Sequence, residues 1–205
     1  MFARVNTIFG TKDKVQDGIT HLEKTDRAVV DAAAGHRGLT TLVDRQSGVI
    51  VAMSYWDEPT DSSQAALTRA REGAAAAAGG DLVTESFEVA SQEMLSFPSP
   101  DAAVRMERVQ LEPARVADAL GFIRGKVLAQ LRAESGFCIA ELLVDISAGR
   151  GLLLTAWTGE EDATRADAVI DELRDEAVGR AGVTFPRTEK YVLVRMSAPS
   201  IPTEG

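Results

Sequence analysis

Few residues in this sequence have the types and spacing that catalysis or metal binding requires. The single cysteine, Cys138, cannot form an internal disulfide and cannot build a zinc site alone. The two histidines, His21 and His36, fall on an expected helix away from its apolar face and in the loop after that helix. Histidines in such places are more often at the surface than bound to a ligand. No serine, histidine and aspartate are spaced as in a hydrolase, and we expect no metal site and no bound cofactor.

Other chemistry-bearing patterns have simpler structural explanations. Acidic residues cluster at 160–162, 171–172 and 175–176, where they are typical of a helix start and of solvated helix faces. Gly149-Arg150-Gly151 resembles a phosphate-binding loop only in composition. No helix is expected directly after it, so it predicts the tip of a hairpin.

Bulk properties exclude several classes of protein. The 205 residues carry a net charge of −9, which argues against a nucleic-acid partner because such binding depends on basic residues. No apolar run approaches the roughly 18 residues of a membrane span. The first residues lack the basic and apolar regions of a signal peptide. We therefore expect a cytoplasmic protein without a nucleic-acid or membrane partner.

The elements that must position any site occur twice along the chain. The segment Thr-Glu-Ser-Phe-Glu-Val at 84–89 returns as Thr-Glu-Lys-Tyr-Val-Leu at 188–193. Two further pairs, Arg4 with Arg105 and Trp56 with Trp157, are each separated by 101 residues. The sequence therefore predicts two copies of one unit, fused head to tail.

Each copy predicts the order strand, helix, strand, strand, helix, strand. Apolar residues at helical spacing mark the helices, and apolar runs flanked by glycine mark the strands. In the first copy the first helix is expected at 13–34, and the strands are expected at 2–9, 39–44, 49–56 and 82–90. In the second copy the first helix is expected at 113–134, and the strands are expected at 104–111, 137–146, 151–158 and 188–196.

These ranges define the expected domain organisation. The first repeat covers 1–90 and the second covers 102–197. The segment 91–101, which contains Pro98 and Pro100, predicts a linker. The last residues, 198–205, predict a flexible tail.

The order βαββαβ is that of the ferredoxin-like unit, in which helices cover one face of a four-stranded sheet. A sheet with one exposed face should alternate apolar and polar residues, but 49–53 and 152–154 are apolar throughout. The second face must therefore be covered, and the other copy's sheet is the natural candidate. We predict an α+β fold in which tandem ferredoxin-like repeats form an intramolecular dimeric α+β barrel.

At this level the chain resembles the antibiotic-biosynthesis monooxygenase-like superfamily. The resemblance rests on the opening strand Arg4–Ile8, on Gly38 before the second strand, and on a third strand that ends in Tyr-Trp-Asp-Glu at 55–58. It implies oxygen chemistry without a metal or flavin, or haem binding and breakdown, with the substrate between the sheet and its helices.

The resemblance also implies a role for Asn6, because an asparagine on the first strand recurs in both kinds of active site. A carboxamide offers a donor and an acceptor together, which suits a phenolate or a carbonyl oxygen. The alternative is a strand residue bonded to a neighbour or to water. Glu107 stands at the matching position in the second copy, where we expect it half-exposed and paired with Arg105 or Arg108, or acting as a base if it is buried. A single active site would then lie in the first copy.

Trp56 ends the third strand and could wall a substrate pocket, which makes it the candidate substrate-binding residue. Trp157 holds the same position in the second copy, and its recurrence equally fits a packing role.

The resemblance to haem-degrading members stops at the second helix. Those members place a histidine and a tryptophan there, whereas residues 64–72 contain neither. We therefore predict a cofactor-independent monooxygenase acting on a small aromatic or polyketide-like substrate. The alternative is a non-catalytic module that binds a small hydrophobic ligand or another protein, and self-association stays open.

Overall fold

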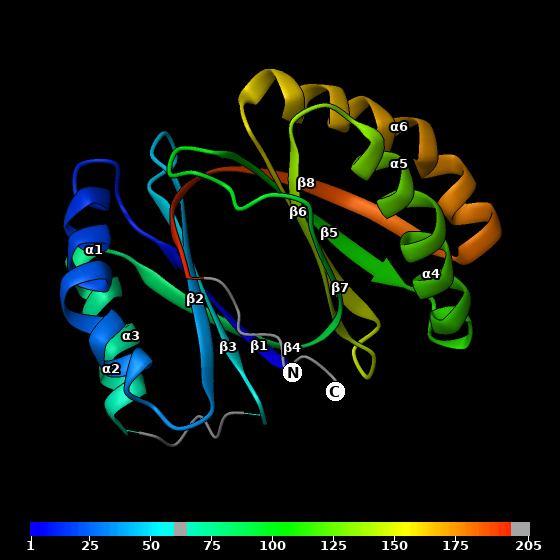
Figure 1. The fold of residues 1–205 in the computed structure, drawn as a ribbon. Coiled ribbons are helices and arrows are strands. Elements are labelled where there is room, and N and C mark those ends of the chain that lie inside the picture. The colour runs from blue at the N-terminus through cyan, green and yellow to red at the C-terminus, as the bar shows by residue number, and fades with distance from the viewer. Residues whose placement is uncertain (60–64, 198–205) are drawn as a thin grey trace. The chain divides into compact units, whose positions relative to one another are not determined.

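The computed structural model describes residues 1–59 and 65–197, so the predicted tail at 198–205 lies outside the described residues. The chain divides into two compact units (Figure 1). Unit 1 comprises Met1–Phe87 and the residues from Leu193 onward, and unit 2 comprises Glu88–Val192. Each unit is described by itself below.

The two halves of the chain contain the same elements in the same order, apart from one additional short 3-10 turn, η2, in the second half. The first half holds β1 (Phe2–Phe9), α1 (Val15–His21), η1 (Leu22–Asp26), α2 (Arg27–Asp31), β2 (His36–Asp44), β3 (Val49–Trp56), α3 (Ala65–Ala78) and β4 (Asp81–Met94). The second holds β5 (Ala103–Leu111), η2 (Pro113–Arg115), α4 (Val116–Phe122), η3 (Ile123–Val127), α5 (Leu128–Ala133), β6 (Phe137–Asp145), β7 (Arg150–Trp157), α6 (Glu160–Ala181) and β8 (Val183–Met196).

The strands are hydrogen-bonded in the order β1-β3-β2-β8-β5-β7-β6-β4. Within unit 1, β3 is paired antiparallel to both β1 and β2. Within unit 2, β7 holds the equivalent place between β5 and β6. This strand order confirms the predicted α+β fold class of two ferredoxin-like units with the hydrogen-bonding pattern of an intramolecular dimeric barrel.

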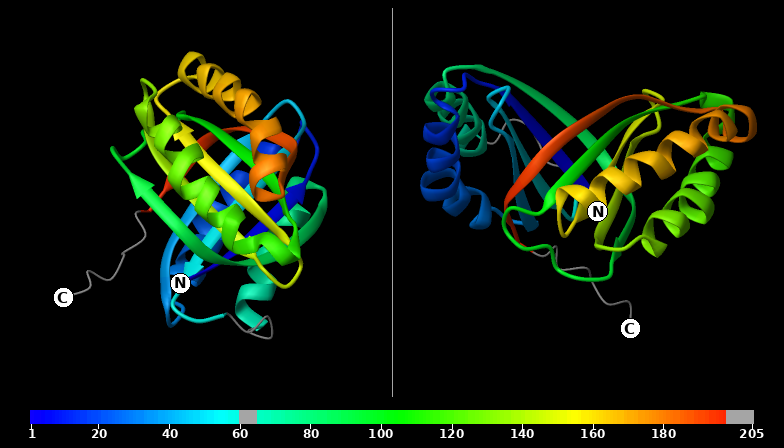
Figure 2. Two further views of the ribbon diagram at one scale, coloured as in Figure 1. Left: turned by 90° about the vertical axis from the view of Figure 1, so that its right-hand side faces the viewer. Right: turned by 90° about the horizontal axis from the view of Figure 1, so that it is seen from above.

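The helices of each unit cover one face of its strands. Figure 1 shows α1, α2 and α3 together on one side of β1, β2 and β3, and the right-hand view of Figure 2 shows α4, α5 and α6 on one side of the unit 2 strands. The core of unit 1 joins β1, β2 and β3 to α1 and α3 through small and branched side chains, among them Ile8, Ile50, Val15, Ile19 and Ala74. Unit 2 is filled with larger residues, including Leu131, Leu142, Leu153, Trp157 and Phe185. No helix among residues 1–59 and 65–197 is long and apolar enough to cross a membrane.

The closing strands differ from the prediction. β4 runs on to Met94, four residues into the segment predicted as a linker, and its residues from Glu88 to Met94 are paired with β6 of unit 2. The end of β8 returns to unit 1, where Ser197 donates its backbone N–H to the Leu39 carbonyl at 3.0 Å. Each 14-residue closing strand is thus shared between the units. Backbone groups of β4 beyond residue 90 find hydrogen-bond partners on β6. The domain boundaries at 90 and 102 stay predictions.

Each predicted long first helix contains one wider, π-helical turn. This turn spans Leu22–Asp26 in unit 1 and Ile123–Val127 in unit 2, 101 residues apart. A π-helical turn adds a residue to the helix and rotates the side chains that follow it. The last residue of the turn is Asp26 in one repeat and Val127 in the other, and both are buried.

Close helix contacts at Gly18 generate a stability prediction. A Cβ atom at Gly18 would meet the Ala78 Cβ and the Ile50 Cδ1, each at 2.7 Å. We expect Gly18→Ala to lower the free energy of unfolding by about 1–3 kcal/mol, because overpacking outweighs the gain in helix propensity. Urea denaturation measures the change.

The matched control is Gly121→Ala on α4, where a Cβ meets nothing within 4 Å. We expect this variant to match or exceed the stability of the wild type by up to about 1 kcal/mol. Equal effects at the two glycines would contradict the packing argument.

Candidate functional site

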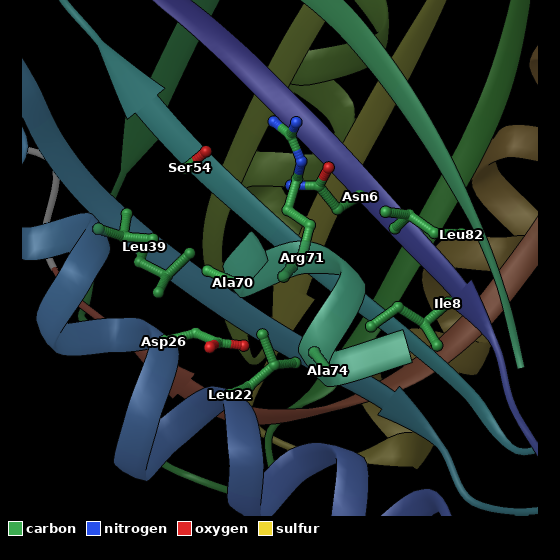
Figure 3. Close-up of a pocket in the computed structure, with 12 residues that line it drawn as sticks. Asn6, Ile8, Leu22, Asp26, Leu39, Ser54, Ala70, Arg71, Ala74 and Leu82 are labelled. Carbon is green, nitrogen blue, oxygen red and sulfur yellow. The ribbon is translucent and has the colours of Figure 1, made fainter. Parts of the chain in front are cut away.

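Unit 1 contains a cavity of about 30 Å³ between its sheet and its helices. This volume exceeds that of a single water molecule on the same scale. Apolar side chains make up most of the wall, and four polar ones join them (Figure 3). The lining residues are Asn6, Ile8, Leu22, Asp26, Val30, Leu39, Ala52, Ser54, Ala70, Arg71, Ala74 and Leu82.

A second cavity of about 20 Å³ lies beside the first. The two share Asn6, Val30, Ser54 and Arg71 as lining residues, and Trp56 borders only the second. Arg71 therefore borders both cavities.

Asn6 faces this cavity. It stands opposite Ala52 of β3, and both side chains are on the face toward the helices. The hydroxyl of Thr84 on β4 donates to Asn6 Oδ1 at 2.9 Å. No described residue accepts a hydrogen bond from Asn6 Nδ2, so this amide can donate to a ligand oxygen.

Asp26 is a second functional group, which sequence analysis did not identify. The π-helical turn places it at the cavity wall, where the residue is only 3% exposed. His21 Nε2 lies 3.3 Å from Asp26 Oδ1, and Oδ2 has no hydrogen-bond partner among the described residues. Burial raises the pKa of Asp26 to about 6, although the neighbouring His21 opposes the rise. A carboxylate with this pKa is a stronger base than an ordinary aspartate.

His21 connects Asp26 to solvent. Its side chain is 34% exposed, and it was expected to be a surface residue without a role. The structure places it against Gly73 of α3, where an added Cβ would meet His21 Nε2 at 2.7 Å. The missing side chain at position 73 leaves room for the imidazole to reach Asp26, so His21 can exchange protons between the buried carboxyl group and water.

Arg71 supplies the positive charge of the site and was also missed. Figure 3 shows its side chain extending from α3 toward Asn6 on β1. Its Nη2 donates to the Thr68 hydroxyl at 3.0 Å. Burial lowers the pKa of Arg71, with the nearby Glu72 opposing the shift. Among the described residues, no carboxylate forms an ion pair with Arg71.

The tryptophans have the same contacts in both units. Trp56 Nε1 donates to the Ser54 hydroxyl at 2.9 Å, and Trp157 Nε1 donates to Thr155 at the same distance. Trp56 packs edge-on against His36, and Trp157 packs in the same way against Phe137. These contacts fit the packing role, while the border with the smaller cavity keeps Trp56 as a candidate substrate contact.

The corresponding space in unit 2 is a remnant of about 10 Å³. Three positions that are small in unit 1, Ala52, Ala70 and Leu82, correspond in the repeat to larger, buried residues. These are Leu153, Leu173 and Phe185.

The charged groups of the unit 2 remnant are paired with one another. Arg105 donates to Glu160 at 2.6 Å and to Asp167 at 2.9 Å. Glu107 is 3% exposed and accepts from Thr188 at 2.9 Å, with Arg174 at 3.8 Å. The expectation of a half-exposed Glu107 paired with Arg105 or Arg108 is therefore wrong.

The reason for this error is geometric. β5 points Glu107 and Arg105 to the same helix-covered face, but α6 supplies the charged partner of each. Burial raises the pKa of Glu107, opposed by the Thr188 hydrogen bond and by Arg174.

The described residues contain no group of three or more histidine, cysteine or acidic side chains placed to hold a metal ion. Cys138 is buried, as expected, with its thiol 3.5 Å from the Gly136 carbonyl oxygen.

Comparison with known proteins finds relatives in Mycobacterium tuberculosis. The chain is 30% identical to the uncharacterized protein Rv2558 over 186 residues, which is 89% of this chain and 78% of that protein. It is also 30% identical to the uncharacterized protein Rv2557 over 154 residues, covering 74% of this chain and 69% of the relative. No protein-family model matches the sequence.

Solved structures with the same fold include several related to monooxygenases. A proposed monooxygenase from Fusobacterium nucleatum gives a TM-score of 0.69 at 13% identity, covering 96% of this chain and 93% of that one. An anthrone oxidase-like protein gives 0.66 at 17% identity, with coverages of 98% and 94%. A haem-degrading enzyme from Listeria monocytogenes gives 0.51 at 12% identity, with coverages of 94% and 99%. At these identities the likeness shows the fold of the predicted superfamily.

The raised pKa of Asp26 makes a prediction about pH. An aspartate titrates near pH 4 in the unfolded chain and near pH 6 here, so the folded state holds the proton more tightly between these values. Stability contributed by this group is therefore lost as pH rises from 4 to 6. We expect Asp26→Asn to be more stable than the wild type at pH 7 by about 2 kcal/mol, and the two to converge near pH 4. Denaturant unfolding at a series of pH values measures the difference.

Asp145→Asn serves as the control for this measurement. Hydrogen bonds from Ser147 and from the backbone of Ala148 lower the pKa of Asp145, so its contribution has the opposite sign. This variant should lose stability relative to the wild type as pH rises through 4. A difference between Asp26→Asn and the wild type that does not change with pH would show that Asp26 is not buried as a proton-binding group.

Proposed function

The chain belongs to the family of the Mycobacterium tuberculosis proteins Rv2557 and Rv2558, and from this premise we propose that the unit 1 cavity is the active site of a cofactor-independent monooxygenase. Its substrate is a small aromatic or polyketide-like molecule with an acidic C–H or O–H group. The observation that carries the proposal is the buried Asp26, with a pKa of about 6, in the same cavity as the amide of Asn6.

Asp26 is suited to remove a proton from the substrate. At neutral pH it is mostly ionised. A base whose pKa lies close to the working pH is largely in its proton-accepting form and still has a high affinity for the proton. The apolar wall around it limits solvation of the carboxylate, which favours proton transfer. His21 then passes the proton from Asp26 to solvent, which readies the site for another turnover.

Asn6 is suited to hold the oxygen that becomes negatively charged. When the substrate loses its proton, charge moves onto the phenolic or carbonyl oxygen. The donor at Asn6 Nδ2 is fixed because Thr84 holds Oδ1, and a fixed donor stabilises the developing oxyanion without reorganisation.

The substrate anion itself then supplies electrons to dioxygen. For an anthrone-type substrate, one oxygen atom of O₂ becomes the new carbonyl oxygen at the former methylene carbon. The other oxygen atom leaves as water with the two hydrogens of that methylene, so the products balance. The protein provides the base and the oxyanion donor for this reaction.

The haem alternative has less support. The likeness to a haem-degrading enzyme concerns the fold, and α3, which borders the cavity, contains no histidine from Ala65 to Ala78. A non-catalytic binding module remains the competing function, and the assay below separates the two.

Oxygen uptake with anthrone tests the proposed function. We expect the wild type to exceed spontaneous oxidation, with kcat/KM rising as Asp26 ionises around pH 6. Asp26→Asn should reduce kcat by about 10²–10⁴-fold through loss of the base. Asn6→Ala should reduce it by about 10²–10³-fold through loss of the oxyanion donor. An oxygen electrode and the absorbance of anthraquinone record both sides of the reaction.

The control is Glu107→Gln, which changes the residue equivalent to Asn6 in unit 2 and keeps its hydrogen-bonding capacity. We expect its rate to stay within about twofold of the wild type, because surface and remote substitutions rarely alter a distant site. Wild-type uptake equal to spontaneous oxidation, or an unchanged rate in Asn6→Ala, would favour the binding module.

A further inference from the structure

The two units contain equivalent arginines in different electrostatic settings. Arg71 and Arg174 are 103 residues apart, as are the glycines that follow their helices, Gly79 and Gly182. Both arginines belong to the second long helix of their unit. The residue opposite the arginine on the first strand is the neutral Asn6 in unit 1 and the acidic Glu107 in unit 2.

In unit 2, the arginine forms an ion pair with a carboxylate of the same chain. Glu107 Oε2 lies 3.8 Å from Arg174 Nη2 and accepts a hydrogen bond from the Thr188 hydroxyl at 2.9 Å. Arg174 also donates to the backbone carbonyl of Phe185 and to Asp171. The guanidinium and the buried carboxylate thus neutralise each other within the fold.

In unit 1, the same framework is present without the carboxylate. Thr84 donates to Asn6 at 2.9 Å, as Thr188 does to Glu107. Asn6 is neutral and one methylene shorter than glutamate. Asp26, the carboxyl group of the cavity, pairs with His21 and makes no ion pair with Arg71. Among residues 1–59 and 65–197, the half-buried guanidinium of Arg71 therefore has no carboxylate partner of the kind that Glu107 provides for Arg174.

We propose that the unit 1 cavity binds a small aromatic carboxylate, whose carboxylate group takes the place that the Glu107 carboxylate occupies in unit 2. The ligand's carboxylate pairs with Arg71, and its phenolic or carbonyl oxygen accepts from Asn6 Nδ2. This names the substrate class of the monooxygenase proposed above and depends on that proposal for the identity of the site.

The sizes of the groups agree with this assignment. The positions where unit 1 has Ala52, Ala70 and Leu82 carry larger residues in unit 2. Unit 1 therefore has more free space on the side of the sheet where it lacks the carboxylate. A planar guanidinium forms two parallel hydrogen bonds with a carboxylate, which sets the orientation of the ligand as well as its affinity. Arg71 also borders both cavities, so a carboxylate in either one can reach its guanidinium.

Binding of salicylate compared with salicylamide tests this inference. Salicylate has a carboxylate beside a phenolic oxygen, and salicylamide is its neutral match. We expect the wild type to bind salicylate at least about tenfold more tightly in titration calorimetry, the size expected for a partly buried charge-assisted pair. Arg71→Gln should remove this preference, and Arg71→Lys, which keeps the charge, should retain part of it.

Asn6→Glu provides a test from the other side, because it restores the carboxylate of unit 2. We expect it to pair with Arg71, to keep or raise the free energy of unfolding, and to abolish salicylate binding. The matched control is the double variant E107Q/R174Q, which removes the corresponding ion pair of unit 2 without leaving a lone charge. Its affinity for salicylate should stay within about twofold of the wild type.

Equal affinities for the two ligands, no binding of either, or undiminished salicylate binding by Arg71→Gln would each overturn the inference. The assay separates this failure from failure of the proposed function. An Arg71-dependent preference for salicylate in a protein that consumes no oxygen would retain the carboxylate site and remove the monooxygenase. Oxygen uptake that depends on Asp26, without a carboxylate preference, would do the reverse.

Discussion

A partly buried arginine under the sheet requires a counter-charge, and the two units differ in whether the described residues supply it. Unit 2 supplies Glu107 from its first strand, held by Thr188 and facing Arg174. Unit 1 keeps the threonine and the arginine but has Asn6 in place of the glutamate. Removing a charge from water is unfavourable unless a partner compensates, and this one difference between the units is the basis of the carboxylate site proposed in unit 1.

The remaining differences between the units also concern how far the space between sheet and helices is filled. Unit 2 fills its interior with leucine and phenylalanine side chains, and its cavity is reduced to about 10 Å³. Unit 1 has smaller residues at these places and a carboxyl group, Asp26, where unit 2 has Val127. A protein with two copies of one fold can let one copy provide stability while the other accepts buried polar groups, which lower stability but permit chemistry. The closing strands β4 and β8 each run across the boundary between the units.

The helix that carries Asp26 shows how local geometry creates the candidate site. A regular helix over the same residues would direct the side chains after Leu22 differently, because each residue turns by about 100°. The π-helical turn recurs in unit 2 with Val127 at its end, so the turn belongs to the fold. Its use in unit 1, where it places a carboxyl group with a raised pKa against an apolar wall, belongs to the site.

The sequence by itself determined the order of elements, because the internal repeat and the apolar patterns are local and periodic. The resemblance singled out Asn6 on the first strand, and the structure shows that its side chain lies on the helix-covered face of β1. Only the tertiary structure showed the strand sharing beyond residue 87, because hydrogen-bond partners of a strand end lie far away in the sequence. Only the tertiary structure likewise brought Asp26 and Arg71 to the same cavity as Asn6. These residues come from three separate elements, and a comparison of the repeats shows that positions 26 and 6 differ in charge, but not that they border one space. That depends on how the helices pack on the sheet and on a helical turn that the sequence pattern does not mark.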